Sequence, residues 1–374
     1  MAATLKSRYG REVPIKLAAM IAAVHPTFPG KAFIRDALAG YDALELMQRG
    51  RQIAASLHRH LPDDYLAAIA ILVRSLGPKN PRWDGADADT GLGSFLYLPH
   101  VFFIAEHGLE HFDASMHAQY ELTQRFTAEW SIRPYLERFP QATLARLRVW
   151  AGDESEHVRR LVSEGTRPRL PWASRLREFQ KDPKPVLALL ELLKDDPALY
   201  VRRSVANNLN DIGKDHPELL VATARRWMKG ASENRQYVVR HALRSAVKAG
   251  DADALAVLGY ADQGELSISK VRFAPSPVRI GEAVIITFDV TNKSAQRQRV
   301  LADLRVHFVK ANGKASPKVF KLKALELDPG EAVRFQKKVS MAALSTRKHF
   351  PGSHCVEALL NGAAKLLGRF ELVK

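Results

Sequence analysis

An acidic side chain beside a row of arginines is the first feature of this sequence that could do chemistry. Three segments align on a shared Val-Arg pair, which puts Arg159, Arg202 and Arg240 at equivalent positions, 43 and 38 residues apart. In the first segment Glu156 stands where the other two have leucine and tyrosine. A repeated scaffold needs no acid at that position, so the comparison predicts a functional site around Glu156.

The chemistry that a carboxylate could do in a basic groove is limited. It opposes phosphate binding, but it can stabilise the oxocarbenium-like sugar that forms when a base leaves a nucleotide, and it can orient water. A surface ion pair with Arg159 or Arg160, one helical turn away, is the alternative interpretation of Glu156. Glu121 and Glu129 lie on an earlier predicted helix, Ser115–Trp130, and could reach the same groove or could be solvated acids.

The repeat spacing of about 40 residues is typical of stacked helix pairs of the HEAT class. Residues 1 to 260 carry apolar residues at steps of three and four, interrupted by proline and glycine, which predicts helices throughout this region. Stacked copies of one basic helix face would build a concave, positive surface. We therefore expect an α-α superhelix of HEAT-like repeats over residues 1–260.

The hydrophobic period changes after Gly264. Val284, Ile286, Phe288 and Val290 alternate with more polar neighbours, and further alternating segments follow between turn signals such as Asn-Gly and Asp-Pro-Gly. About seven short strands in about 110 residues predict an antiparallel sandwich of immunoglobulin type over residues 265–374.

The charge of the chain is strongly positive and unevenly distributed. The net charge is +16 and the sequence pI is about 9.9, which favours a polyanion as partner. Residues 265–374 hold 20 lysines and arginines against 9 acids, a net charge of +11. We expect the sandwich to be a second nucleic-acid contact, although a basic exterior without a partner explains the charge as well.

Several other classes of protein are not expected. The single cysteine, Cys355, permits neither an internal disulfide nor a cysteine zinc site, which fits a reducing cytoplasm. Apolar runs are too short to span a bilayer, so no membrane partner is expected. His107, Glu110 and His111 match a zinc-protease pattern, but Gly108 weakens the helix and no third ligand follows. We expect no metal and no cofactor.

Four segments resemble a known family closely. ESEHVRRLVSEGTRPRLPW at Glu154–Trp172 and YVRRSVANNLNDIGKDHP at Tyr200–Pro217 are similar to the AlkC branch of bacterial DNA alkylation repair glycosylases. AEWSIRPY at Ala128–Tyr135 and LKSRY at Leu5–Tyr9 are similar as well. The resemblance covers essentially residues 1–260, and the C-terminal sandwich resembles the immunoglobulin-like domain of some members by architecture.

The resemblance implies an activity and assigns roles to residues. It implies a monomeric glycosylase that excises cationic alkylated bases, 3-methyladenine above all and 3-methylcytosine as well, from double-stranded DNA without deep base flipping. Glu156 would be the principal catalytic carboxylate, and Glu121 the second acid. The phosphate-binding residues would be Arg159, Arg202, Arg203 and Arg240, and Trp172 would pack near the sugar of the lesion.

Two other functions share the basic face but give the acids no role. One is a non-catalytic helical-repeat protein that binds nucleic acid, and the other is a HEAT adaptor for an acidic protein. Release of free base from methylated DNA distinguishes both from the glycosylase.

Overall fold

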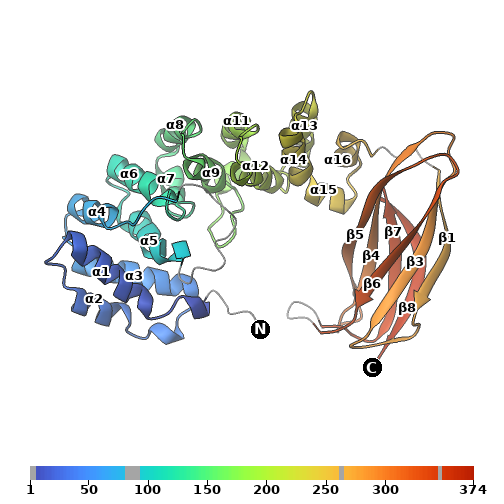
Figure 1. Cartoon of the computed structure of the whole chain (residues 1–374), viewed down its shortest axis with the longest axis horizontal. Coiled ribbons are helices and arrows are strands. Elements are labelled where there is room, and N and C mark those ends of the chain that lie inside the picture. Colours follow the sequence, from blue (N-terminus) through green and yellow to red (C-terminus); the bar gives the residue numbers. More distant parts are fainter. Residues whose placement is uncertain (1–5, 81–92, 261–264, 344–347) are drawn as a thin grey trace. The chain divides into compact units, whose positions relative to one another are not determined.

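The computed structural model describes residues 6–80, 93–260, 265–343 and 348–374. The chain forms two compact units, one of residues 1–220 and 230–242, the other of residues 221–229 and 243–374. The first unit is helical and the second is built around two β-sheets (Figure 1), which confirms the predicted class of a helical repeat region followed by a sandwich. No helix in the described part of the chain is long and apolar enough to cross a membrane.

The α-helices of the first unit are α1 Glu12–Val24, α2 Gly30–Ala37, α3 Leu46–His60, α4 Tyr65–Arg74, α5 Leu98–His107, α6 Phe112–Thr123, α7 Ile132–Arg138, α8 Pro140–Trp150, α9 Glu156–Gly165, α10 Arg177–Lys181, α11 Lys184–Leu193, α12 Leu199–Ile212 and α14 Glu233–Ala242. Helix α13, Pro217–Met228, runs from the first unit into the second. Short 3-10 helices cover Lys6–Arg8, Tyr41–Ala43 and Gly93–Tyr97.

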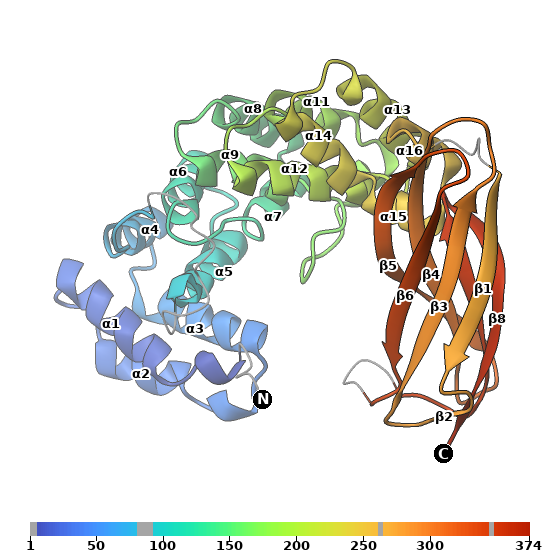
Figure 2. The same ribbon diagram turned by 45° about the vertical axis from the view of Figure 1, so that its right-hand side comes forward.

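The helices of the first unit stack in two rows, as the repeat spacing predicted. Helices α9, α12 and α14 pack side by side in one row, while α8 and α11 pack in the other. Figure 2 shows the row of α5, α7, α9 and α12 on the concave side of this unit, where the loop after α9 also projects. The stack is held by apolar side chains such as Val158, Val205 and Val239, all of which are fully buried.

One predicted helix is shorter than expected, and the difference matters for the site. The sequence predicted a helix over Ser115–Trp130, but α6 ends at Thr123. Its last turn is closed by side chains, since Gln124 donates to the carbonyl of Tyr120 at 3.0 Å and Arg125 donates to that of Glu121 at 2.7 Å. Glu129 therefore lies in the loop between α6 and α7 and not on a helix with Glu121.

Within the residues that the structure describes, the second unit contains a sandwich of eight strands. Its strands are β1 Leu266–Ala274, β2 Val278–Arg279, β3 Ala283–Asn292, β4 Gln298–Val309, β5 Ala315–Leu327, β6 Ala332–Ser340, β7 Gly352–Leu360 and β8 Ala363–Val373. One sheet has the order β1-β3-β6 and the other β2-β8-β7-β4-β5. Antiparallel pairing dominates, and the short β2 pairs with β8 in parallel.

The core of the sandwich follows the predicted alternation. Val284, Ile286, Phe288 and Val290 of β3 are buried against the opposite sheet. Helices α15 Arg244–Ala249 and α16 Ala252–Val257 belong to this unit. The turn at Gly250, which has φ +84°, meets the turn at Gly362 so closely that a Cβ at Gly250 would lie 3.0 Å from the Gly362 carbonyl oxygen.

Candidate active site

Two of the three aligned arginines bind backbone carbonyls just before their own helices. In α9 the Nη1 of Arg159 donates to the carbonyls of Asp153 and Glu154 at 2.8 and 2.9 Å. In α12 the Nη1 of Arg202 donates to the carbonyls of Asp196 and Pro197, both at 2.7 Å. Arg159 and Arg202 thus each bind the two carbonyls that lie five and six residues before them. This common contact explains why arginine recurs at these two aligned positions.

Arg159 also links one repeat to the next. Its guanidinium pairs with the Asp196 carboxylate through two contacts of 2.6 and 3.0 Å. Arg202 is 8% exposed, whereas Arg203 and Arg240 are exposed. Arg203 and Arg240 are thus the exposed members of the predicted phosphate-binding set, and their role stays a prediction.

A cleft of about 350 Å³ lies where the loop after α6, helix α9, the loop after α9 and the start of α12 meet. Aromatic and charged side chains line it together, namely Phe95, Phe126, Thr127, Glu129, Trp130, Arg160, Glu164, Arg167, Leu170, Pro171, Trp172 and Tyr200. Two carboxylates and an exposed tryptophan in one cleft make it the strongest candidate for a site.

Arg160 joins the two carboxylates of this cleft. It contacts Glu129 Oε2 at 2.7 Å and Glu164 Oε1 at 3.7 Å, and it lies 5.1 Å from the centre of the Tyr200 ring. Thr127 fixes the pair, since it accepts from Arg160 at 3.0 Å and donates to Glu129 Oε2 at 2.9 Å. The guanidinium therefore holds two acids from different segments of the chain in one place.

Glu164 is tied down further on its other side. Arg167 contacts its Oε1 at 2.6 Å, and Ser204 of α12 donates to its Oε2 at 2.6 Å. Arg167 continues to Asp211 at 2.8 Å, and Asp211 accepts from Lys214 at 2.7 Å. Acidic and basic side chains alternate along this network, so each buried charge lies beside a charge of opposite sign that offsets its cost of desolvation.

The network keeps the Glu164 carboxylate ionised. Burial acts to raise the pKa of Glu164, but attraction by Arg160 and Arg167, with hydrogen bonds from Ser204 and Arg167, lowers this pKa below its usual range. Burial acts to lower the pKa of Arg160, but the negative charges of Glu129 and Glu164, with Tyr200 and the hydrogen bond to Glu129, together raise this pKa. Charge is thus retained on largely buried side chains of the cleft.

The lowered pKa predicts how stability depends on pH. A carboxyl whose pKa is lower in the folded state stabilises the fold above its unfolded pKa, about 4.3 for glutamate, and this contribution is lost as pH falls through the folded pKa. We expect Glu164→Gln to lose less stability than the parent between pH 7 and pH 3. Urea denaturation at the two pH values measures the difference, and an equal loss in both proteins would contradict the assignment.

Trp172 is held open at the rim of the cleft. Its side chain is 64% exposed, and its backbone has φ +61°, a left-handed conformation that costs a bulky residue energy. An exposed indole on a strained backbone beside two carboxylates suits a contact surface, and packing of Trp172 near the sugar of a lesion stays a prediction.

The two acids predicted as catalytic lie elsewhere. Glu156 is the first residue of α9, half-buried, and its charge acts on Arg159. Glu121 on α6 pairs with Arg125 at 2.8 Å and with Lys79 at 3.4 Å. Neither is among the described residues that line the cleft. Their catalytic role stays a prediction, and the geometry favours Glu129 and Glu164.

Some residues of the cleft had a signal that sequence reasoning missed. Glu164 follows Leu161 by three residues, on the face of α9 that also buries Val158. A charged residue in register with a buried apolar face is unusual and indicates a partnered charge. Asp211 does not line the cleft but binds Arg167, and it carries the same signal because it lies beside Ile212 in the buried part of α12.

The two histidines of the zinc-protease pattern, His107 and His111, pack against other aromatic rings. His107 stacks on His58 with ring centres 3.8 Å apart, and His111 stacks on Tyr65 at 5.0 Å. Across the described ranges, no group of three or more metal-ligating side chains converges.

Comparisons with known proteins cover the whole chain. Residues 267–374 match the family model described as "Uncharacterised protein YhaZ, C-terminal Ig-like domain". The uncharacterized protein YhaZ of Bacillus subtilis (strain 168) is 35% identical over 364 residues, which span 97% of this chain and 98% of that protein. The solved structure of Pseudomonas fluorescens alkylpurine DNA glycosylase AlkC, bound to DNA containing an abasic site analog, superposes with a TM-score of 0.90 at 36% identity and full coverage of both chains.

Proposed function

Because the chain belongs to the AlkC family of DNA glycosylases, we propose that it hydrolyses the N-glycosidic bond of alkylated bases in double-stranded DNA. The observation that carries the proposal is the cleft in which Glu129 and Glu164 are fixed around Arg160. Full-length similarity to a DNA-bound glycosylase supports the same activity. The substrates are cationic bases, 3-methyladenine first and 3-methylcytosine second.

The two carboxylates suit the charge that develops in this reaction. A cationic alkylated base leaves without strong acid catalysis, so the barrier lies in forming the sugar cation and attacking it with water. A carboxylate held ionised beside the sugar stabilises that cation, and it can accept a proton from the attacking water. Both carboxylates are largely buried at the cleft, with side chains 11% exposed at Glu129 and 8% exposed at Glu164.

The site is open to the surface of the protein, which supports reaction on a nucleotide at the protein surface. Trp172 lies exposed beside the carboxylates, where it can pack against the sugar or the gap left by a displaced base. Such a site differs from the deep pocket that base-flipping enzymes use.

Loss of the Trp172 ring should weaken the enzyme more than a change of ring type. Stacking on an aromatic side chain contributes about 1–3 kcal/mol per base, so Trp172→Ala should lower affinity for DNA with an abasic-site analogue about tenfold. Trp172→Phe should retain most of the affinity. Equal binding by Trp172→Ala, Trp172→Phe and the parent in an anisotropy titration would remove this residue from the interface.

The basic sandwich supplies a second DNA contact in this proposal. Lys318 and Lys337 stand over the ring of Phe320 at 5.1 and 6.0 Å, from strands β5 and β6. If both bind phosphates, the Lys318→Gln/Lys337→Gln double variant should lower the slope of log affinity against log salt by about 2. An unchanged slope would exclude this pair. Arg203 and Arg240 are the proposed phosphate ligands of the helical unit.

A base-release assay tests the function as a whole. The full-length protein is incubated with DNA treated with a methylating agent, and free bases are separated by chromatography. Release of 3-methyladenine above the spontaneous rate supports the proposal. Binding without release would favour a non-catalytic nucleic-acid-binding protein instead.

A further inference from the structure

The loop between α9 and α10, residues 166–176, carries Trp172 and has no regular structure of its own. Its ends are joined by one backbone hydrogen bond, from the Leu176 amide to the Pro168 carbonyl at 3.3 Å. Pro168 and Pro171 prevent it from continuing as a helix. Something outside the loop must therefore fix where Trp172 stands.

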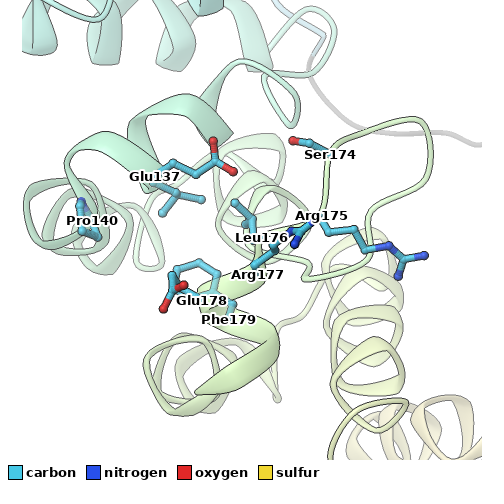
Figure 3. A pocket seen from close by; sticks show the side chains of 9 residues that line it. Glu137, Pro140, Ser174, Arg175, Leu176, Arg177, Glu178 and Phe179 are labelled. Atoms are coloured by element: carbon cyan, nitrogen blue, oxygen red, sulfur yellow. The ribbon is translucent and has the colours of Figure 1, made fainter.

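Apolar packing cannot do this on both sides of the loop. On one side Leu170, Pro171 and Trp172 face the cleft of about 350 Å³. On the other side Ser174 and Leu176 line a cavity of about 650 Å³, whose far wall is formed by α7 around Glu137 (Figure 3). Leu170 and Leu176 at the base of the loop are buried, but its tip at residues 171–175 is largely exposed. The tip therefore makes few of the contacts that lock side chains in a protein interior.

Arg167 and Arg169 anchor the first half of the loop through Asp211 and Asp215, and Arg133 on α7 adds contacts to the backbone on both sides of the turn. Its Nη1 donates to the carbonyls of Gly165 and Arg167 at 3.1 and 2.9 Å, and its Nη2 donates to the carbonyl of Ser174 at 2.5 Å. One planar guanidinium thus binds backbone before and after the loop turn, seven residues apart at Arg167 and Ser174. The rigid fork of arginine suits this geometry better than the point charge of lysine.

The position of Arg133 is itself well defined. Helices α7 and α9 approach so closely that a Cβ at Gly165 would lie 2.6 Å from Ile132 Cγ2. Arg133 is 2% exposed, and burial lowers its pKa to about 10. Burying a charge is costly, yet Arg133 buries its guanidinium to bind backbone carbonyls. Arg133 is therefore a candidate for fixing the conformation of the loop that it binds.

We propose that Arg133 is a positioning residue, which fixes the loop of residues 166–176 and so places Trp172 at the rim of the cleft. The inference rests on the proposed function for its effect on activity, but the position of the loop does not depend on it. Arg133 is buried and is not among the residues that line the cleft, although the charges of Glu137 and Glu129 act on it.

The test compares Arg133→Met with a matched buried arginine. Arg49 on α3 is 8% exposed and also binds carbonyls, those of Tyr9 at 2.7 Å and Leu44 at 3.1 Å, far from the loop in the sequence. In Arg133→Met the single-turnover rate of base release should fall about tenfold or more, since small misplacements are costly. Arg49→Met should retain the parental rate, and Arg133→Lys should recover part of the loss.

A second readout follows the loop without DNA. Trypsin cuts after arginine, and mass spectrometry should show faster cleavage after Arg169, Arg175 or Arg177 in Arg133→Met than in the parent or in Arg49→Met. If the parent releases no base, the proposed function fails while the proteolysis still tests the loop. Unchanged proteolysis, a parental rate in Arg133→Met, or an equal loss in Arg49→Met would each overturn the proposal.

Discussion

Replacing Glu129 by glutamine should slow release of 3-methyladenine about a hundredfold or more. Glutamine keeps the size and much of the hydrogen bonding of glutamate but removes the charge that faces the developing sugar cation. Preorganised groups of this kind contribute roughly 3–4 kcal/mol to a transition state. Glu164→Gln should cost a similar factor if it acts directly, and less if it only holds Arg160. Single-turnover chromatography of released base measures both.

Glu156 and Glu121, the two acids that the sequence predicted to be catalytic, serve as matched controls for the Glu129 and Glu164 variants. Glu156→Gln and Glu121→Gln change the same functional group on α9 and α6, outside the described lining of the cleft. We expect each to change the rate less than about tenfold, well below the effect of removing a group from an active site. A hundredfold loss in Glu156→Gln alone would return the catalytic role to the residue that the repeat comparison favoured.

The repeat predicted the scaffold well because repetition reflects packing. Arginine recurs at positions 159 and 202 because each side chain donates to the two equivalent carbonyls just before its own helix. A comparison of copies therefore finds what the scaffold needs in every copy. A reaction happens once, so its residues need not recur, and Glu129 lies in a loop outside the aligned segments.

The predicted helix over Ser115–Trp130 was too long for a related reason. No proline or glycine ends α6, so apolar periodicity extended the predicted helix to Trp130. The helix ends because Gln124 and Arg125 turn back to its final carbonyls, a tertiary arrangement that local propensity does not encode. In the sandwich, alternation predicted β3 to β8. It predicted neither β1 nor β2, and β2 has only two residues.

Removing Arg160 should destabilise the helical unit severely. Its side chain is 15% exposed and compensates Glu129 and Glu164 together. Arg160→Met removes the ion-pair partner of the largely buried Glu129 and leaves Glu164 paired with Arg167, and breaking a buried pair in this way typically costs about 3–5 kcal/mol. Urea denaturation at neutral pH should show this loss, which is large beside the stability of a typical domain.

Two controls separate the buried pair from a general effect of losing an arginine. Arg146→Met removes a more exposed arginine, whose partner Asp113 is 86% exposed, and should cost about 0–1 kcal/mol. In the double variant Arg160→Met/Glu129→Gln the orphaned charge is gone, so stability should partly recover although a further contact is lost. If the double variant recovers stability but not base release, two conclusions follow. The charge of Glu129 destabilises the fold when Arg160 is absent, and the same charge is needed for base release. If Arg160→Met costs no more than Arg146→Met, the cleft does not depend on this pair, and its carboxylates must be held by Thr127, Ser204 and Arg167 instead.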